Sequence, residues 1–189
     1  MKNLIQIISK CDLCKASLPQ SPKPILQLGK SAKIIVIGQA PGRLAHETGK
    51  PWNDKSGERL RRWLNLTKNV FYDSEQVALI PMGFCFPGSG KSGDLPPKKE
   101  CAPFWHPKIL TTLPVHIPKL LVGSHAQQYY LNDKLSLTDR CRQWQHYTPD
   151  YLPLPHPSPR NNIWIKKNPW FEAEVLPEYQ KLVGNALSV

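Results

Sequence analysis

The sequence predicts an α/β fold, a three-layer α/β/α domain with a central, mostly parallel four-stranded sheet, and a single domain over residues 1–189. Two observations carry this prediction. Several short apolar runs have the continuous, β-branched composition of buried parallel strands, and helical segments separate them. Strands that alternate with helices are typical of a parallel sheet covered on both faces. A chain of 189 residues is long enough to bury a full core.

Four segments are expected to form the sheet, namely Lys33–Gly38, Val77–Pro81, Lys119–Gly123 and Tyr151–Leu154. Ligands of such sheets bind outside the carboxyl ends of the strands. An irregular, polar or glycine-containing segment follows each strand there: GQAPG, PMGFCFPG, GSHAQ and HPSPRN. Their convergence on one edge of the sheet is the main indication of a functional site.

Helices are expected between the strands. Ser56 is predicted to cap the segment GERLRRWLNL, which has apolar residues at helical spacing. Shorter helices are predicted over Pro107–Leu113 and Ser124–Leu131. The last helix is predicted to open at residues 168–169, a capping asparagine followed by proline, and Pro177 is predicted to kink it or to mark a second start.

Charge favours a polyanionic partner. The chain has 25 Lys+Arg against 14 Asp+Glu, a net charge of +11, which favours nucleic acid over a membrane, although solubility alone is the simpler explanation. No run reaches the length of a membrane span, and MKNLIQIISKCDLC is too short and broken for a signal peptide. We therefore expect a cytoplasmic protein with no membrane partner, and no obligate protein partner is evident.

Five cysteines without an export signal argue against a disulfide framework. Cys11 and Cys14 form a C-x-x-C pair, and Cys85 and Cys101 flank the loop FPGSGKSGDLPPKKE. Two ligands from each segment are enough to close a four-thiolate site, and the spacing alone does not separate zinc from an iron–sulfur cluster. Cys141 stands apart and is predicted to be a buried small apolar residue.

Two of the edge segments contain candidate site residues. In GQAPG, Gly38 and Gly42 permit close backbone approach, and the Gln39 amide can both donate and accept hydrogen bonds. The segment lacks the spacing of a dinucleotide fingerprint or a P-loop. In HPSPRN, His156 is held between prolines, and Ser158 and Arg160 suit a phosphate. Three further histidines, His106, His116 and His146, are interpreted as having no role in a site.

With these motifs in order, the chain resembles the uracil-DNA glycosylase superfamily, most closely its iron–sulfur branch, often called family 4. That branch has a Gly-acid-Ala-Pro-Gly motif, which GQAPG matches except at Gln39. RLAHETGKPW has the length of the stretch leading to Gly-x-Pro-Phe, with Trp52 at the aromatic position. Cys85 and Cys101 follow the second strand as the family cysteines do, and HPSPRN matches the closing His-Pro motif.

The resemblance implies that a damaged base in DNA is flipped into a pocket and that water cleaves its bond to deoxyribose. By this match His156 donates a hydrogen bond to the base, and Trp52 stacks on it. Ser158 and Arg160 lie near the flanking phosphates. The implied cofactor is a [4Fe–4S] cluster with a structural role, held by Cys11, Cys14, Cys85 and Cys101, with zinc as the alternative. The base-binding residues expected from the match are Gly38, Ala40, Pro41, Gly42, Trp52, Asn53 and His46.

Two departures from the family pattern bear on the chemistry. Neither Gln39 nor Ala40 can take a proton from water, so Gln39 is expected to orient the water, with His46 and Glu47 as second choices. Pro81 stands where relatives have an asparagine that reads the uracil edge, and Asn53 is the candidate replacement.

The expected function is a monofunctional DNA glycosylase that acts on uracil or a related deaminated base and so initiates base-excision repair. No lysine lies in an obvious pocket motif, so a Schiff-base lyase step is not expected. The alternatives are a non-catalytic iron–sulfur protein of the same fold that binds nucleic acid, and a zinc-stabilised domain with a small-molecule ligand.

Overall fold

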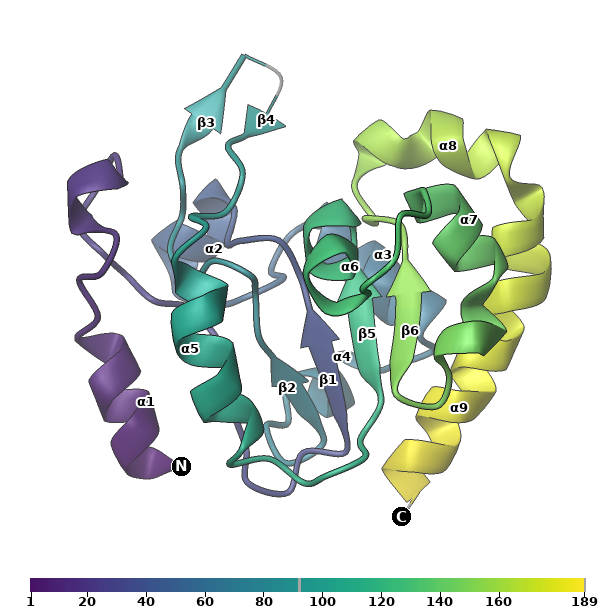
Figure 1. The fold of residues 1–189 in the computed structure, drawn as a ribbon, viewed down its shortest axis with the longest axis horizontal. Helices are drawn as coiled ribbons and strands as arrows, with labels where there is room; N and C mark the ends of the chain where they lie inside the picture. The colour runs from purple at the N-terminus through teal and green to yellow at the C-terminus, as the bar shows by residue number, and fades with distance from the viewer. Residues whose placement is uncertain (92, 189) are drawn as a thin grey trace.

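The computed structural model describes residues 1–91 and 93–188. Four parallel strands form the central sheet in the order β2-β1-β5-β6 (Figure 1). The strands are β1 (Ile34–Ile37), β2 (Val77–Leu79), β5 (Lys119–Val122) and β6 (Tyr151–Leu154). All four predicted strands are confirmed, and every pair in this sheet is parallel.

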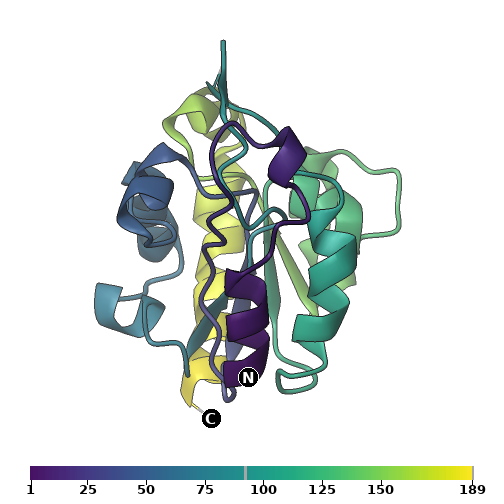
Figure 2. The same ribbon diagram turned by 90° about the vertical axis from the view of Figure 1, so that its left-hand side faces the viewer.

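Helices cover both faces of the sheet, because the strand residues are apolar on both sides. In β1, Ile34 and Val36 belong to one core, and Ile35 and Ile37 belong to the other. Figure 2 shows the three layers. The first core packs against α3 (Lys55–Trp63), α4 (Lys68–Phe71), α7 (Leu137–Arg142) and α9 (Leu176–Ser188), and the second against α1 (Lys2–Ser9), α5 (Cys101–Leu110) and α6 (Ser124–Tyr130).

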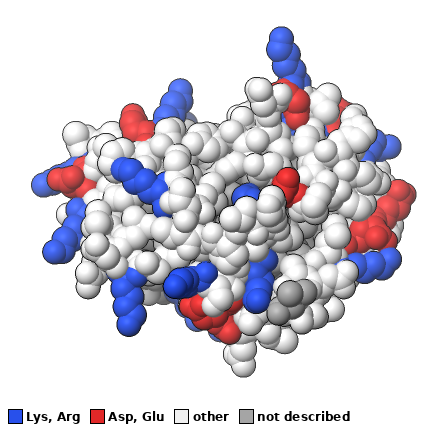
Figure 3. Space-filling model, turned by 60° about the horizontal axis from the view of Figure 1, so that its bottom comes forward, with Lys and Arg blue, Asp and Glu red and all other residues white. Residues whose placement is uncertain are grey.

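Two short helices and a small hairpin lie near the carboxyl edge of the sheet, at the top of Figure 1. They are α2 (Arg43–Thr48), α8 (Asn162–Lys167) and the antiparallel pair β3 (Ser89–Gly90) and β4 (Gly93–Asp94). The opposite face, formed by the amino ends of the strands, carries basic and acidic side chains interspersed (Figure 3). Within the described residues, no helix combines the length and the apolar character that crossing a membrane requires.

Two predicted helix starts are wrong. Asp54 caps α3, because its Oδ1 accepts a hydrogen bond from the Gly57 N–H at 2.8 Å, whereas Ser56 lies buried in the first turn. Helix α5 starts at Cys101, ahead of the predicted Pro107. Pro103 fits the first turn, where the backbone N–H has no helical partner, so the helix can begin before both prolines.

The carboxyl-terminal helix begins at Pro169, as predicted. Its next residues, Phe171–Val175, form a π-helical segment, and the regular helix α9 starts at Leu176. Pro177 has no N–H to donate to the preceding turn, so a change in hydrogen bonding there is expected on physical grounds. The predicted second start at Pro177 is confirmed to within one residue.

Candidate functional site

A cleft of about 540 Å³ opens at the carboxyl edge of the sheet. Its walls come from the segments after β1 and β6, from residues 51–56 and from the β3–β4 hairpin. The segment after β2 contributes Pro81, and Gly123 of GSHAQ lies behind His156 without lining the cleft. The cleft brings together most of the predicted site residues: Gly38, Gln39, Ala40, Pro41, Gly42, Trp52, His156, Ser158 and Arg160.

His156 is held in one protonation state by its surroundings. Burial lowers the pKa of its imidazole, and Asp54, Arg160 and Asp94 act on it more weakly. Nδ1 lies 3.2 Å from the backbone nitrogen of Ser158, which can only donate a hydrogen bond. The ring is therefore neutral near pH 7, with its hydrogen on Nε2. A neutral Nε2–H in a cleft can donate to an oxygen on a bound base.

Trp52 packs between the GQAPG and HPSPRN segments. Its ring lies against Gly38, where an added Cβ would be 2.6 Å from Trp52 Cζ2. The same ring stacks on His156 with centroids 5.6 Å apart and planes at 28°. The Trp52 backbone has a φ of 55°, and its carbonyl accepts hydrogen bonds from the Tyr72 hydroxyl at 3.0 Å and from Arg61 at 3.2 Å. These two hydrogen bonds hold the Trp52 backbone in place, and with it the ring that lines the cleft.

Gly57 permits this arrangement, and replacing it should be costly. An added Cβ would lie 1.8 Å from the Trp52 carbonyl oxygen. Although alanine normally favours a helix, we expect Gly57→Ala to destabilise the fold by about 1–3 kcal/mol, measured by urea unfolding. Gly184 in α9 has no heavy atom within 4 Å of an added Cβ. Gly184→Ala should therefore stabilise by about 0.5–1 kcal/mol, and similar effects of the two changes would contradict this account.

The β3–β4 hairpin forms the outer wall of the cleft. The Gln39 amide donates to the Leu95 carbonyl at 3.5 Å. Gly93, at φ 128°, lies so close to Arg160 that an added Cβ would overlap its guanidinium group. Asp94 lines the cleft, with Oδ2 3.1 Å from the position of an added Cβ on Gly42. The glycine-rich loop thus folds back over the GQAPG turn.

Sequence reasoning missed the two carboxylates of the cleft, Asp54 and Asp94. The second-choice residues lie elsewhere: Glu47 is exposed and pairs with Arg43 at 3.7 Å, and His46 packs beside Phe86 without lining the cleft. Asn53 does not line the cleft either. A signal for Asp54 was present, because aspartate is among the residues preferred at the position that caps the start of a helix.

The Pro81 carbonyl contacts a buried histidine, His106. His106 is 1% exposed, and its Nε2 lies 3.1 Å from the Pro81 carbonyl oxygen. Its Nδ1 lies 2.6 Å from the Tyr130 hydroxyl. The Pro81 carbonyl is thus engaged, and the proline ring that lines the cleft offers no hydrogen bond to a base. His106 is therefore a structural residue of the cleft floor.

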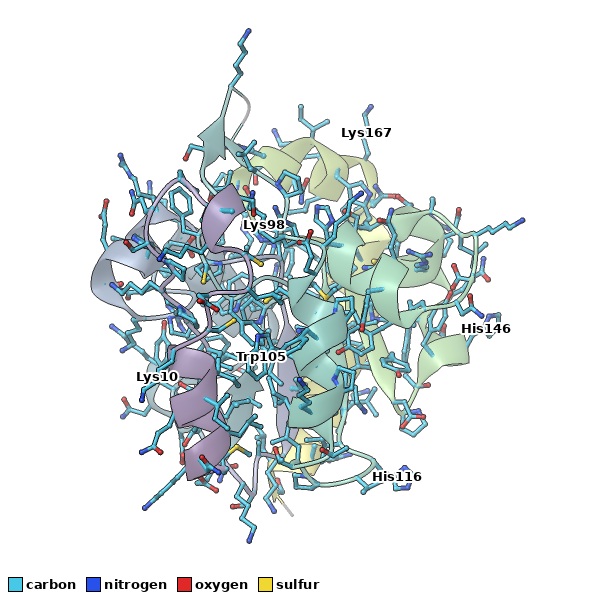
Figure 4. The ribbon with its side chains drawn as sticks, turned by 60° about the vertical axis from the view of Figure 1, so that its left-hand side comes forward. Lys10, Lys98, Trp105, His116, His146 and Lys167 are labelled. Atoms are coloured by element: carbon cyan, nitrogen blue, oxygen red, sulfur yellow. The ribbon has the colours of Figure 1, made fainter. Side chains whose placement is uncertain are left out.

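His106 should make stability fall in acid. Burial lowers its pKa to about 4, whereas an unfolded histidine titrates near 6.5. The unfolded chain therefore binds a proton between about pH 6.5 and 4 that the folded chain does not, and up to about 3 kcal/mol of stability is lost across this range. His106→Asn should flatten this slope in urea unfolding against pH, and the exposed His116 (Figure 4), replaced by Asn, should not. Equal slopes in wild type and His106→Asn would contradict the assignment.

The four predicted ligand thiols gather at one place. A small space of about 20 Å³ beside the start of α5 is lined by Cys11, Cys14, Cys85 and Cys101. Two N–H groups donate to these sulfurs, Trp105 Nε1 to Cys11 at 3.2 Å and Phe84 N to Cys101 at 3.3 Å; Trp105 is labelled on α5 in Figure 4. Burial raises the pKa of the Cys85 thiol to about 11 and that of Cys101 to about 12.

These four thiols have the chemistry of a metal-binding donor set. Buried thiols with raised pKa values need a cation to become thiolates, and N–H donors then stabilise the sulfur charge. The four thiols share the lining of one space. Among the described residues, no three His, Cys, Asp or Glu side chains are already placed to hold one metal ion. Cys141 is fully buried on the other face of the sheet, as predicted.

The fold and the cleft define the class of protein: an α/β domain with a cleft at the carboxyl edge of a parallel sheet. Residues 26–180 match the family model of the Uracil DNA glycosylase superfamily, and the chain belongs to this family. It is also similar to a solution NMR structure from Methanosarcina acetivorans that is provisionally assigned as a uracil DNA glycosylase. That match has 13% sequence identity and a TM-score of 0.48, and it covers 84% of this chain and 98% of the other.

Proposed function

We propose that the protein is a monofunctional DNA glycosylase that hydrolyses the N-glycosidic bond of uracil or a related deaminated base in DNA. The observation that carries this proposal is the neutral His156, whose Nε2–H is available in a cleft walled by Trp52. Membership of the superfamily supports the same reaction class.

The geometry suits the charge that the reaction creates. As the bond from C1′ to the base nitrogen breaks, positive charge develops on the sugar and the electron pair leaves with the base. A preorganised donor such as His156 stabilises the base anion by roughly 3 kcal/mol. Stacking on Trp52 stabilises the flipped base by about 1–3 kcal/mol. Water then bonds to C1′, and Gln39, which lines the cleft, would orient it.

The surroundings of the cleft suit a DNA strand. Ser158 and Arg160 line the cleft, and the charged residues of an adjoining open pocket are Arg43, Lys91 and Arg160 together with Asp54 and Asp94. With a net charge of +11, the basic groups among them favour the phosphate backbone. No lysine is among the described residues that line the 540 Å³ cleft, which favours water over a lysine amine as the nucleophile.

We further propose that the four cysteines hold a [4Fe–4S] cluster, which would place the chain in the iron–sulfur branch. When bound, the cluster would supply a rigid cross-link between residues 11–14 and the ends of the hairpin loop. His156 lies in a separate cleft, so the cluster has no evident part in the hydrolysis itself. Iron and zinc analysis of protein purified without oxygen decides between cluster and zinc, and stoichiometric zinc without iron would overturn the cluster.

The proposed function is tested by base release. Labelled DNA strands carrying uracil, hypoxanthine or xanthine, single-stranded and in each pairing, are incubated with excess protein and then heated in alkali. Cleavage at uracil is expected, and cleavage only at another base would keep the mechanism and change the substrate. If metal-loaded, folded protein releases no base but still binds DNA, the chain is a non-catalytic binding protein instead.

A further inference from the structure

The GQAPG turn lacks a group that the proposed reaction needs. Attack by water on C1′ releases a proton, and the sugar carries positive charge while the base departs. A carboxylate serves both needs, because it accepts a proton and attracts the cationic sugar. Neither Gln39 nor Ala40 provides one, so a carboxylate of the cleft has to come from another segment. Asp54 and Asp94 are the two among the described lining residues.

The Asp54 carboxylate is already engaged in a helix cap. Its Oδ1 accepts the Gly57 N–H at 2.8 Å and caps α3. A carboxylate that holds a helix start in this way is anchored by the helix, and moving it toward a water molecule would break the cap. Asp54 therefore serves the fold of residues 51–57 and contributes charge to the cleft from a fixed position.

Asp94 is placed over the GQAPG turn with one oxygen unengaged. Its Oδ1 accepts a hydrogen bond from the Ser89 hydroxyl at 3.2 Å across the hairpin. Its Oδ2 lies 3.1 Å from the position of an added Cβ on Gly42, and among the described residues it has no hydrogen-bond partner. The absence of a side chain at Gly42 leaves room for this oxygen beside the turn.

The next residue fixes the position of Asp94 relative to Gln39. The Leu95 carbonyl accepts from the Gln39 amide at 3.5 Å, so the candidate water-orienting amide and the carboxylate lie on the same wall. Asp94 also lies within electrostatic reach of His156, because it contributes to raising the pKa of that ring, against the larger lowering effect of burial. A donor for the base and an acceptor for water thus line one cleft.

We propose that Asp94 is a further catalytic residue, supplying from the hairpin the carboxylate that the GQAPG turn lacks. This proposal rests on the proposed glycosylase function. In the step, the water oxygen forms a bond to C1′ as the bond from C1′ to the base nitrogen breaks. One water proton passes to the Asp94 carboxylate, and the electron pair leaves on the base, stabilised by His156. Asp94 then returns its proton to solvent.

The test compares Asp94→Asn with Asp139→Asn in single-turnover base release. Asp139 is the matched control, because its carboxylate is also exposed and also accepts a hydrogen bond from a serine hydroxyl, that of Ser136, but it does not line the cleft. Asparagine keeps the shape of aspartate at both positions, so both variants should fold, which thermal unfolding checks. We expect Asp94→Asn to lower the rate by roughly 100-fold or more with DNA affinity changed less than about threefold. Asp139→Asn should retain the rate of the wild type.

A second variant separates a catalytic role from a positional one. Asp94→Ala leaves space beside Gly42, and added sodium formate should restore part of its rate, with sodium chloride at equal ionic strength as control. Formate should not rescue His156→Ala. An active wild type whose Asp94→Asn variant keeps its rate overturns the role of Asp94 alone. A wild type that releases no base overturns both this role and the proposed function.

Discussion

His156→Ala is expected to lower the single-turnover rate of base release by roughly 100-fold, the equivalent of about 3 kcal/mol of lost stabilisation of the departing base. The ring is neutral and donates from Nε2 because its Nδ1 accepts the Ser158 N–H and burial lowers its pKa. DNA affinity should change only a few-fold, since affinity comes mainly from phosphate contacts. Stopped-time cleavage assays and a binding titration on the same DNA give the two quantities separately.

Two controls make this result specific. His146→Ala removes an exposed imidazole that lies away from the cleft (Figure 4) and should leave the rate unchanged. His156→Gln retains a hydrogen-bond donor and should recover part of the lost rate. If His156→Ala instead weakens DNA binding in proportion to the rate, the histidine serves binding, and its assignment to the departing base is wrong.

Cys101→Ser should be the most destabilising of the changes considered. Its thiol is buried, with its pKa raised to about 12, and it accepts the Phe84 N–H at 3.3 Å. Without the fourth sulfur the proposed cluster should be lost, and because metal binding is coupled to folding the free energy of unfolding should fall by several kcal/mol. Iron content, the visible absorption of iron–thiolate bonds and thermal unfolding would all report the change.

Cys141→Ala is the matched control for a cysteine that is also buried. It lies on the other face of the sheet, in contact range of Gln127 at 3.9 Å and away from the four clustered thiols. This variant should lose stability through packing but keep its full iron content. A Cys101→Ser protein that retains stoichiometric iron would contradict the ligand assignment.

The parts of the fold set by local pattern were predictable. Short, continuous apolar runs marked all four strands, and the loops that follow β1 and β6 meet at the cleft because parallel strands end at one edge. Helix starts were less predictable, since Asp54 and Ser56 are both good caps and only tertiary packing of Ser56 decides between them. Pro107 suggested a helix start, yet α5 continues through it.

The outer wall of the site was beyond sequence reasoning. Asp94 lies in a glycine-rich loop with no helical or strand periodicity. Its place in the cleft depends on contacts between distant segments: Gln39 with Leu95, and Gly93 with Arg160. Such contacts depend on how a loop folds back in three dimensions, which the sequence pattern does not encode.

The amino-terminal helix α1 packs on the core through few side chains. Only Ile8 is buried, Met1 and Leu4 pack partly against the core, and Ile5 and Ile7 remain substantially exposed. Loss of the proposed cluster bonds at Cys11 and Cys14 should therefore let residues 1–18 open as a local unit while the sheet stays folded. Limited digestion should then cut first in this segment when iron is withdrawn. Resistance of the amino terminus to protease would thus become a simple gauge of how much of a preparation carries the proposed cluster.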